Sequence, residues 1–391
     1  MQKLTVLGAT GSIGINVLDV VSQHPKKFKI FALTCNTRVV ELSAQCEQFK
    51  PYFAVVTDIS KVKELKKLLK VASPNTIVLV GTDGLCKVAS DKSVDTVVAA
   101  IVGSAGLLPT LEAAESGKKI LLANKESLVM AGSLLMEAVN LSGGILMPID
   151  SEHNAIYQCL PDQYVSPKES GVSKVLLTAS GGPFRSRDKK SMREVTVDEA
   201  CAHPNWKMGR KISVDSATMM NKGLEFIEAC LLFGLSPDQI EVVIHPQSIV
   251  HSMVEYLDGS TLAQLSNPDM RTPIAHALAW PKRVRSGVSS LDIVSTKRLD
   301  FEPPDFERFP CLSLAISAAR AGGSAPIVLN ASNEVAVNAF LNNEILFTQI
   351  SEVVELALKE VVSIEPNTLK LVQSCDRKTR DITLKLIKKH F

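Results

Sequence analysis

The sequence predicts an α/β fold in which a doubly wound parallel sheet comes first, a central α+β domain follows, and a small helical bundle ends the chain. Three observations support this order. Short apolar runs alternate with amphipathic stretches in the first third, glycine-rich turns separate mixed elements in the middle, and helical spacing dominates the end. A length of 391 residues, with 46% hydrophobic and 21% charged residues, fits a folded chain of two or three domains.

The N-terminal third alternates predicted strands with predicted helices, which is typical of a parallel sheet. The predicted strands are Leu4–Leu7, Lys29–Thr34, Phe53–Val56, Thr76–Val80, Thr96–Val102, Lys119–Leu122 and Ile145–Ile149. The helical segments between them are Asn16–Ser22, Val40–Phe49, Lys61–Leu69 and Leu108–Ser116. We therefore expect one domain over residues 1–149.

The rest of the chain divides at Leu299–Pro310, whose prolines and acidic turn residues exclude a regular element. Strands predicted before it are Lys174–Leu177, Glu241–Ile244, Val250–Tyr256 and Ser260–Leu265. Helices predicted after it are Cys311–Ala321, Asn333–Leu341, Ile350–Val361 and Asp376–Lys389. We expect a second domain over residues 150–285, a linker over 286–310 and a C-terminal α-helical domain over 311–391.

Charge and composition exclude several classes of protein. The 43 Lys and Arg residues nearly balance 41 Asp and Glu, so no overall field favours nucleic acid or an anionic membrane. No apolar run reaches the ~18 residues of a membrane-spanning helix, and a glycine-rich stretch begins too close to Met1 for a secretory signal. The eight cysteines form no C-x-x-C pair and are expected to be reduced thiols. We expect a soluble, cytoplasmic protein.

A glycine-rich loop follows the first predicted strand and opens the first helix. It reads Gly8-Ala9-Thr10-Gly11-Ser12-Ile13-Gly14. Glycines at this place allow a tight turn and bring the backbone close to a pyrophosphate, which binds the free N–H groups of the helix N-terminus. The G-x-x-G-x-x-G spacing therefore predicts a dinucleotide cofactor in a Rossmann-like domain.

The end of the second predicted strand indicates which dinucleotide binds. An NAD site would offer an acidic residue there, whereas this chain reads Cys35-Asn36-Thr37-Arg38. A guanidinium with hydrogen-bonding neighbours suits a 2′-phosphate, which favours NADP(H). A solvated surface charge is the alternative interpretation of Arg38.

Two carboxylates follow the strand Ile145–Ile149. Asp150 and Glu152 are at i and i+2, and on an extended chain their side chains would point the same way. Paired carboxylates of this kind bind a hard divalent cation, although a polar strand end without a metal is the alternative.

A second polar cluster lies at Asp215–Glu225. Lys222 and Glu225 are i, i+3 neighbours on a helix face. Ser216, Asn221 and Lys222 supply the hydroxyl, amide and ammonium donors that a phosphate needs. Oxygen ligands favour Mg²⁺ or Mn²⁺ over zinc.

Motifs along essentially the whole chain together resemble the 1-deoxy-D-xylulose 5-phosphate reductoisomerase family. They are GATGSIG at Gly8–Gly14, LLANKES at Leu121–Ser127, PIDSEHNAI at Pro148–Ile156, TASGGPFR at Thr178–Arg185, HPNWKMGRKISVDSATMMNKGLE at His203–Glu225, HPQSIVHSMV at His245–Val254 and PDMRTPIAHALAWP at Pro268–Pro281. The resemblance implies isomerisation and reduction of 1-deoxy-D-xylulose 5-phosphate to 2-C-methyl-D-erythritol 4-phosphate, in the non-mevalonate route to isoprenoid precursors. It implies NADPH and a divalent metal (Mg²⁺, Mn²⁺ or Co²⁺) as cofactors, and a homodimer with the central sheet at the interface.

The resemblance also implies roles for individual residues. The metal ligands are Asp150, Glu152 and Glu225. Substrate contacts are Lys125 and Ser151 at the carbonyl end, Ser180, Ser216, Asn221 and Lys222 around the phosphate, and His203 close by. Cofactor contacts are Thr10, Gly11, Ser12, Ile13, Asn36, Thr37, Arg38, Asn124, Glu126 and Gly209. The segment Cys201–Arg210 resembles a mobile flap, in which Trp206 and Met208 would exclude water from the substrate.

Lys125, Glu152 and His203 are the predicted catalytic residues, with Glu152 the first candidate for moving the hydroxyl proton. The choice between a retro-aldol sequence and an α-ketol shift for the rearrangement stays open. Structural roles also stay open for His153, His245, His251 and Met270. Two other functions compete with this one. A metal-free NADP-dependent dehydrogenase of a phosphorylated or acidic metabolite would leave the carboxylates unexplained. A cofactor-sensing regulator should show a DNA-binding or interaction segment.

Overall fold

The chain folds into two units in the computed structural model, which describes residues 1–202 and 209–391. The first unit comprises Met1–Ser127, Leu135–Asn154 and Asp269–Ser289. The second comprises Leu128–Leu134, Ala155–Pro268 and Ser290–Phe391. This division into two units does not test the predicted domain boundaries at 149, 285 and 310, which stay predictions.

A seven-stranded sheet in the order β4-β3-β2-β1-β5-β6-β7 forms the first unit, and every neighbouring pair is parallel. Its strands are β1 (Gln2–Leu7), β2 (Phe28–Cys35), β3 (Phe53–Val56), β4 (Ile77–Val80), β5 (Thr96–Ala99), β6 (Lys119–Leu122) and β7 (Ile145–Pro148). The strand order reverses direction at β1, between β2 and β5. Ligands of open α/β sheets bind at such a switch point, beyond the carboxyl ends of the strands.

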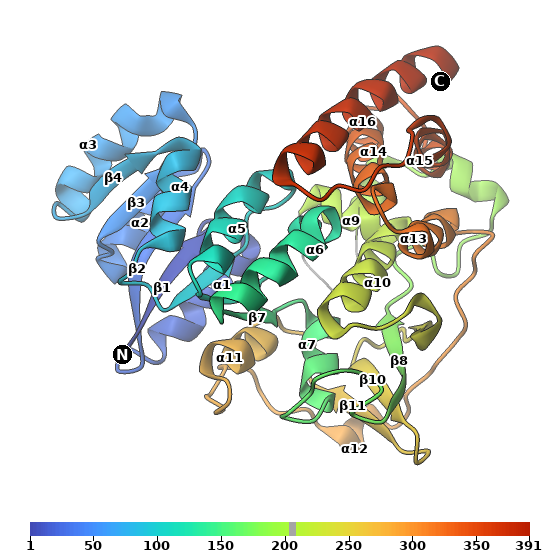
Figure 1. Ribbon diagram of the computed structural model, residues 1–391, viewed down its shortest axis with the longest axis horizontal. Helices are drawn as coiled ribbons and strands as arrows, with labels where there is room; N and C mark the ends of the chain where they lie inside the picture. The colour runs from blue at the N-terminus through green and yellow to red at the C-terminus, as the bar shows by residue number, and fades with distance from the viewer. Residues whose placement is uncertain (203–208) are drawn as a thin grey trace. The chain divides into compact units, whose positions relative to one another are not determined.

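Helices connect these strands, and in Figure 1 α2, α3 and α4 surround the blue strands. The helices are α1 (Ser12–Ser22), α2 (Val39–Phe49), α3 (Val62–Ala72), α4 (Gly81–Ser90), α5 (Leu107–Glu115), α6 (Lys125–Ser142) and α7 (Ser151–Cys159), with short 3-10 turns at Ile59–Lys61 and Ser104–Gly106. The predicted doubly wound sheet is therefore confirmed. The predicted strand Thr96–Val102 is too long, because the chain leaves the sheet after Ala99.

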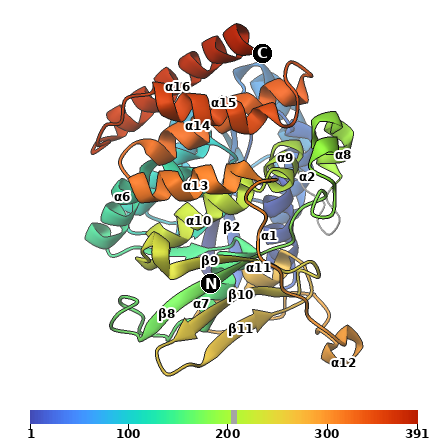
Figure 2. The same ribbon diagram turned by 90° about the vertical axis from the view of Figure 1, so that its right-hand side faces the viewer.

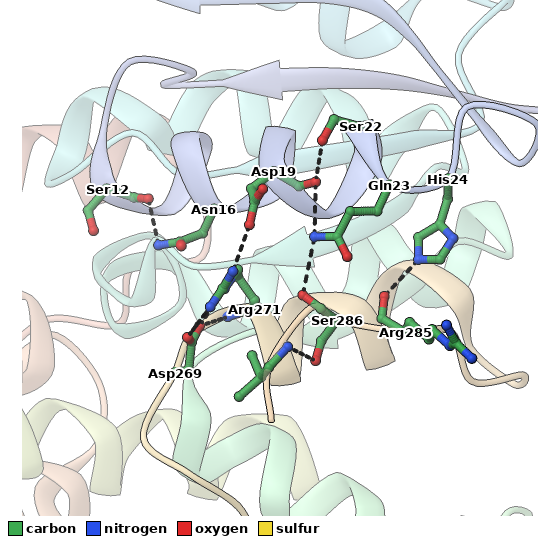
Figure 3. A network of polar contacts seen from close by, with 11 residues as sticks. Ser12, Asn16, Asp19, Ser22, Gln23, His24, Asp269, Arg271, Arg285 and Ser286 are labelled. Atoms are coloured by element: carbon green, nitrogen blue, oxygen red, sulfur yellow. Dashed lines mark hydrogen bonds and ion pairs between the residues drawn. The ribbon is translucent and has the colours of Figure 1, made fainter. Parts of the chain in front are cut away.

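The segment Asp269–Ser289 packs onto α1, although it follows the last strand of the second unit in sequence. It contains α11 (Arg271–Ala279). The Arg271 guanidinium lies 3.0 Å from the Asp19 carboxylate and 2.7 Å from that of Asp269 (Figure 3). The ring Nε2 of His24 lies 2.7 Å from the Arg285 carbonyl oxygen in the same network. These contacts attach the segment to the helix that the glycine-rich loop opens.

The second unit contains a four-stranded sheet in the order β11-β10-β8-β9, in which only β8 and β9 are parallel. Its strands are β8 (Val172–Ala179), β9 (Ile240–Ile244), β10 (Val250–Tyr256) and β11 (Thr261–Leu265). Its helices are α8 (Val197–Cys201), α9 (Arg210–Ala217), α10 (Met220–Phe233), α12 (Ile293–Thr296), α13 (Pro310–Ala321), α14 (Ala325–Leu341), α15 (Gln349–Glu360) and α16 (Leu369–His390), with 3-10 turns at Lys190–Glu194 and Pro237–Gln239. Figure 2 shows α10 between this sheet and the orange and red C-terminal helices.

The C-terminal helical bundle is confirmed, and two of its helices are longer than predicted. α14 begins at Ala325 rather than Asn333, and α16 begins at Leu369 rather than Asp376. The predicted irregular segment Leu299–Pro310 contains a single isolated bridge, from Glu302 to Ile244, before α13 starts. All eight cysteines are free thiols. Among the described residues, no helix is both long and apolar enough to span a membrane.

Candidate active site

The glycine-rich loop lies at the switch point of the first sheet, and two of its glycines cannot be replaced without moving the backbone. Gly8 has φ +83°, and a Cβ there would lie 2.6 Å from the Ala100 carbonyl oxygen. A Cβ at Gly14 would lie 2.4 Å from the Gly8 carbonyl oxygen. The loop is fixed to β2 because the N–H groups of Gly8 and Ala9 donate to Thr34, each at 2.8 Å.

The N-terminus of α1 is suited to an anion. The helix starts at Ser12 with Gly11 as its N-cap, and no side chain caps its first N–H groups. Its first turn carries no acidic residue. The backbone N–H groups of Ser12, Ile13 and Gly14 have no carbonyl partner within the helix, and the helix dipole adds partial positive charge there. The closely packed loop and this helix end fit a dinucleotide pyrophosphate.

The predicted 2′-phosphate residues lie at the end of β2, one strand away from the loop. Asn36, Thr37 and Arg38 are exposed, and Arg38 is the N-cap of α2. The Asn36 side-chain oxygen accepts a hydrogen bond from the Thr57 hydroxyl at 2.8 Å. Asn36 is thus positioned by the next strand, while the Arg38 side chain is accessible for an anionic ligand.

Lys125 and Asp150 form an ion pair at the carboxyl ends of the neighbouring strands β6 and β7. Their charged atoms are 2.6 Å apart, and both side chains are largely buried. The preceding residue, Asn124, caps α6 by accepting from the Ser127 N–H at 2.7 Å and donates to the Gly103 carbonyl at 2.9 Å. The Asn124 side chain therefore fixes the backbone that presents Lys125 and Glu126, which are both buried.

Asp150 and Glu152 present oxygen ligands close together, but not on an extended chain as predicted. β7 ends at Pro148 and α7 begins at Ser151, so Glu152 lies in the first turn of a helix. The Asn154 side chain donates to the Pro148 carbonyl oxygen at 2.8 Å. The backbone N–H of Asn154 donates to the Asp150 carbonyl oxygen at 2.9 Å, and the two bonds close this turn. One carboxylate oxygen from each of Asp150 and Glu152 lies within 4.8 Å of the other. A hard divalent cation fits such an oxygen pair.

The second predicted cluster lies on α9 and α10 of the second unit. Met219, in the left-handed conformation at φ 63°, makes the sharp turn between these helices. Glu225 is buried on α10, and its carboxylate accepts from the Asn221 amide at 2.5 Å and from the Lys222 ammonium. A buried carboxylate held by two donors has a fixed orientation, which is a property of a metal ligand.

The backbone of Gly182 contacts both Ser180 and Ser216. The chain leaves β8 at Ala179, and the Gly182 N–H donates to the Ser180 hydroxyl at 3.2 Å. Gly182 has φ +68°, and a Cβ there would lie 2.6 Å from the Ser216 carbonyl oxygen. The predicted phosphate residues Ser180, Ser216, Asn221 and Lys222 thus gather around the α9–α10 turn.

Two predicted histidines, His245 and His251, are buried in the second unit. His245 is buried at the end of β9, with its Nδ1 2.8 Å from the Asp300 carbonyl oxygen and its ring stacked on Phe301. The Nε2 of His251 lies 2.9 Å from the Ser266 hydroxyl, and burial lowers the pKa of His251 to about 4. His251 is therefore neutral near pH 7, as expected of a packed structural histidine.

Some predicted residues lie outside the described part of the chain. These are His203, Trp206 and Met208 of the predicted flap. Gly209 is described and is the N-cap of α9. The prediction named Asp215 as the start of the second polar cluster but missed its partners, the half-buried Lys211 and the buried Asn333. No local sequence pattern joins Asn333 to residues so far away in the chain.

Family profiles match the chain in three segments. Residues 4–132 match the profile for 1-deoxy-D-xylulose 5-phosphate reductoisomerase. Residues 146–233 match that for the 1-deoxy-D-xylulose 5-phosphate reductoisomerase C-terminal domain, and residues 265–382 match that for the DXP reductoisomerase C-terminal domain.

Relatives and solved structures agree with these matches. The 1-deoxy-D-xylulose 5-phosphate reductoisomerase of Pseudomonas fluorescens (strain SBW25) is 59% identical over 97% of this chain and 96% of its own length. That of Stutzerimonas stutzeri (strain A1501) is 57% identical over 97% and 96%. A crystal structure of DOX-P reductoisomerase in complex with NADPH, fosmidomycin and magnesium has a TM-score of 0.94 at 49% identity, over 99% of this chain and 98% of that one. The Zymomonas mobilis enzyme in complex with NADPH has a TM-score of 0.91 at 45% identity, with the same coverage. The chain therefore belongs to the 1-deoxy-D-xylulose 5-phosphate reductoisomerase family.

Proposed function

We propose that this chain converts 1-deoxy-D-xylulose 5-phosphate to 2-C-methyl-D-erythritol 4-phosphate, as an NADP-dependent oxidoreductase that uses a divalent metal. The observation that carries the proposal is the convergence of Ser180, Ser216, Asn221 and Lys222 around the α9–α10 turn, next to the buried carboxylate of Glu225. These side chains supply donors for a phosphate and a ligand for a metal on one short stretch of structure.

Asp150, Glu152 and Glu225 are the proposed metal ligands. Asp150 and Glu152 follow β7, and Glu225 lies on α10. All their donor atoms are carboxylate oxygens, which favours Mg²⁺ or Mn²⁺ over zinc. When bound, the metal would act as a Lewis acid for the ketone and hydroxyl oxygens of the substrate.

Lys125 and Ser151 would hold the carbonyl end of the substrate. The Lys125 ammonium, already beside Asp150, would stabilise negative charge that develops on oxygen during the rearrangement and the hydride transfer. Glu152, which accepts a hydrogen bond from the Ser151 hydroxyl, is the proposed group that moves the hydroxyl proton. His203 and Trp206 stay predictions for the same end of the site.

The cofactor would bind along the carboxyl ends of β1 and β2. Gly11, Ser12 and Ile13 would bind the pyrophosphate through the N-terminus of α1, beside Thr10. Asn36, Thr37 and Arg38 would bind the 2′-phosphate, which accounts for a preference for NADPH. Asn124, Glu126 and Gly209 are the other proposed cofactor contacts. A homodimer and a cytoplasmic location stay predictions.

The reaction assay is NADPH absorbance at saturating 1-deoxy-D-xylulose 5-phosphate with Mg²⁺ or Mn²⁺. We expect metal-dependent oxidation that chelator abolishes and that Glu225→Gln reduces at least about a hundredfold, since the amide cannot replace a carboxylate ligand. Glu241→Gln is the matched control, because Glu241 is an exposed glutamate on β9 of the same unit, paired with Lys174. Oxidation that is insensitive to chelator would instead favour a metal-free dehydrogenase, and NADPH binding without turnover would favour a sensor.

A further inference from the structure

A buried carboxylate lies one residue before the phosphate-binding Ser216. The side chain of Asp215, on α9, is 1% exposed. It is held by the Lys211 ammonium at 2.9 Å and by the Asn333 amide at 2.8 Å. A buried charge is costly unless it is paired and hydrogen-bonded, so these two partners fix where Asp215 lies.

The position of Asp215 determines the position of the phosphate donors. Ser216 is the next residue, its carbonyl oxygen packs against Gly182, and the tight turn at Met219 leads directly to Asn221 and Lys222. A shift of α9 would therefore move the Ser216 hydroxyl relative to Ser180. It would also rotate the first turn of α10, which carries the other two donors.

Asn333 belongs to the C-terminal helical bundle and is more than a hundred residues from Asp215 along the chain. It is fully buried in α14, and its side chain donates a hydrogen bond to Asp215 of α9. The bundle also supports α10, because α13 packs so closely there that a Cβ at Gly223 would lie 2.4 Å from that of Ala315. Apolar packing fixes the distance between the helices, whereas the directional bond from Asn333 fixes how α9 is turned.

We propose that Asn333 is a positioning residue for the substrate phosphate, which acts through the carboxylate of Asp215. The inference rests on the proposed assignment of Ser216, Asn221 and Lys222 as the phosphate pocket. It gives the C-terminal bundle a part in substrate binding, although no residue of the bundle is proposed to contact substrate.

The test is steady-state kinetics on the full-length enzyme with NADPH and Mg²⁺. Asn333→Asp places a second carboxylate against that of Asp215, and like charges at this distance repel. We expect KM for 1-deoxy-D-xylulose 5-phosphate to rise at least about tenfold, with kcat and the Kd for NADPH within about twofold of wild type.

Asn330→Asp is the matched control. Asn330 is also fully buried in α14, but its amide is 3.4 Å from Glu334 and no described contact joins it to α9. We expect it to lower stability while leaving KM within about twofold. If Asn333→Asp does not fold, Asn333→Ser replaces it, because the shorter side chain removes the bond without adding charge.

The outcomes separate this inference from the function on which it rests. An unchanged KM in a folded Asn333 variant, or an equal rise of KM in Asn330→Asp, would overturn the inference. Ser216→Ala tests the pocket itself in the same assay. If Ser216→Ala leaves KM unchanged, the assignment of the phosphate pocket is wrong, whatever the Asn333 variants do.

Discussion

Gly182→Ala tests whether the proposed phosphate pocket depends on the close approach of two backbone segments. The new Cβ would lie 2.6 Å from the Ser216 carbonyl oxygen, against the 3.4 Å at which ordinary contact begins, so α9 or the loop must move by about 0.8 Å. Displacements near 1 Å in a binding site cost up to about a hundredfold in rate. We expect KM for 1-deoxy-D-xylulose 5-phosphate to rise between about tenfold and a hundredfold, measured by NADPH oxidation.

Gly171→Ala is the control for backbone strain. Gly171 precedes β8 and has φ +66°, almost the value at Gly182, but no atom lies within 4 Å of its would-be Cβ. Both variants should lose about 1–2 kcal/mol of stability from a left-handed alanine, measured by urea unfolding. Only Gly182→Ala should raise KM. An equal change of KM in the two variants, or a KM for Gly182→Ala within twofold of wild type, would refute the reasoning.

Three further predictions concern the cofactor loop, the charged pair and a buried histidine. Gly14→Ala forces a Cβ to 2.4 Å from the Gly8 carbonyl, so the Kd for NADPH from fluorescence titration should rise at least about tenfold; an unchanged Kd would show that the loop is not the cofactor site. Lys125→Ala removes the ammonium beside Asp150, so kcat should fall about 10²–10³-fold with the NADPH Kd retained, and a kcat within threefold of wild type contradicts the role. Burial lowers the pKa of His251 from 6.5 to about 4. Between these pH values unfolding takes up a proton, so the free energy of unfolding falls as pH drops from 6.5 towards 4. His251→Gln should reduce that slope by up to about 1.4 kcal/mol per pH unit in urea unfolding, and an unaltered slope would show that His251 does not contribute to it.

The central strands of the first sheet could be predicted because they are buried on both faces. A strand of this kind is a continuous apolar run, as at Phe53–Val56, whose observed bounds match the predicted ones. Helix α4 was missed because glycines and an aspartate in its first turn resemble a loop. The helix at Ser151 was missed because the strand pattern ran on to Ile149, and the side-chain bond from Asn154 to Pro148 that closes the turn leaves no periodic signal.

Some contacts of the candidate site could also be predicted from the sequence, and others could not. Asn221, Lys222 and Glu225 share one helix face, so their spacing predicted their neighbourhood. The bond from Asn333 to Asp215 is set by how α14 packs on α9, and a single sequence carries no pattern for a pair so far apart. The attachment of Arg271 to Asp19 is of the same long-range kind.

Mn²⁺ binding to the NADPH complex tests the central claim most directly, because it reports on the carboxylate ligands without turnover. Titration calorimetry should find one Mn²⁺ per chain. Asp150→Asn, Glu152→Gln and Glu225→Gln should each weaken it at least about tenfold, whereas the surface control Glu241→Gln should not. Wild-type Mn²⁺ affinity in folded Glu225→Gln would contradict a metal held by these three carboxylates.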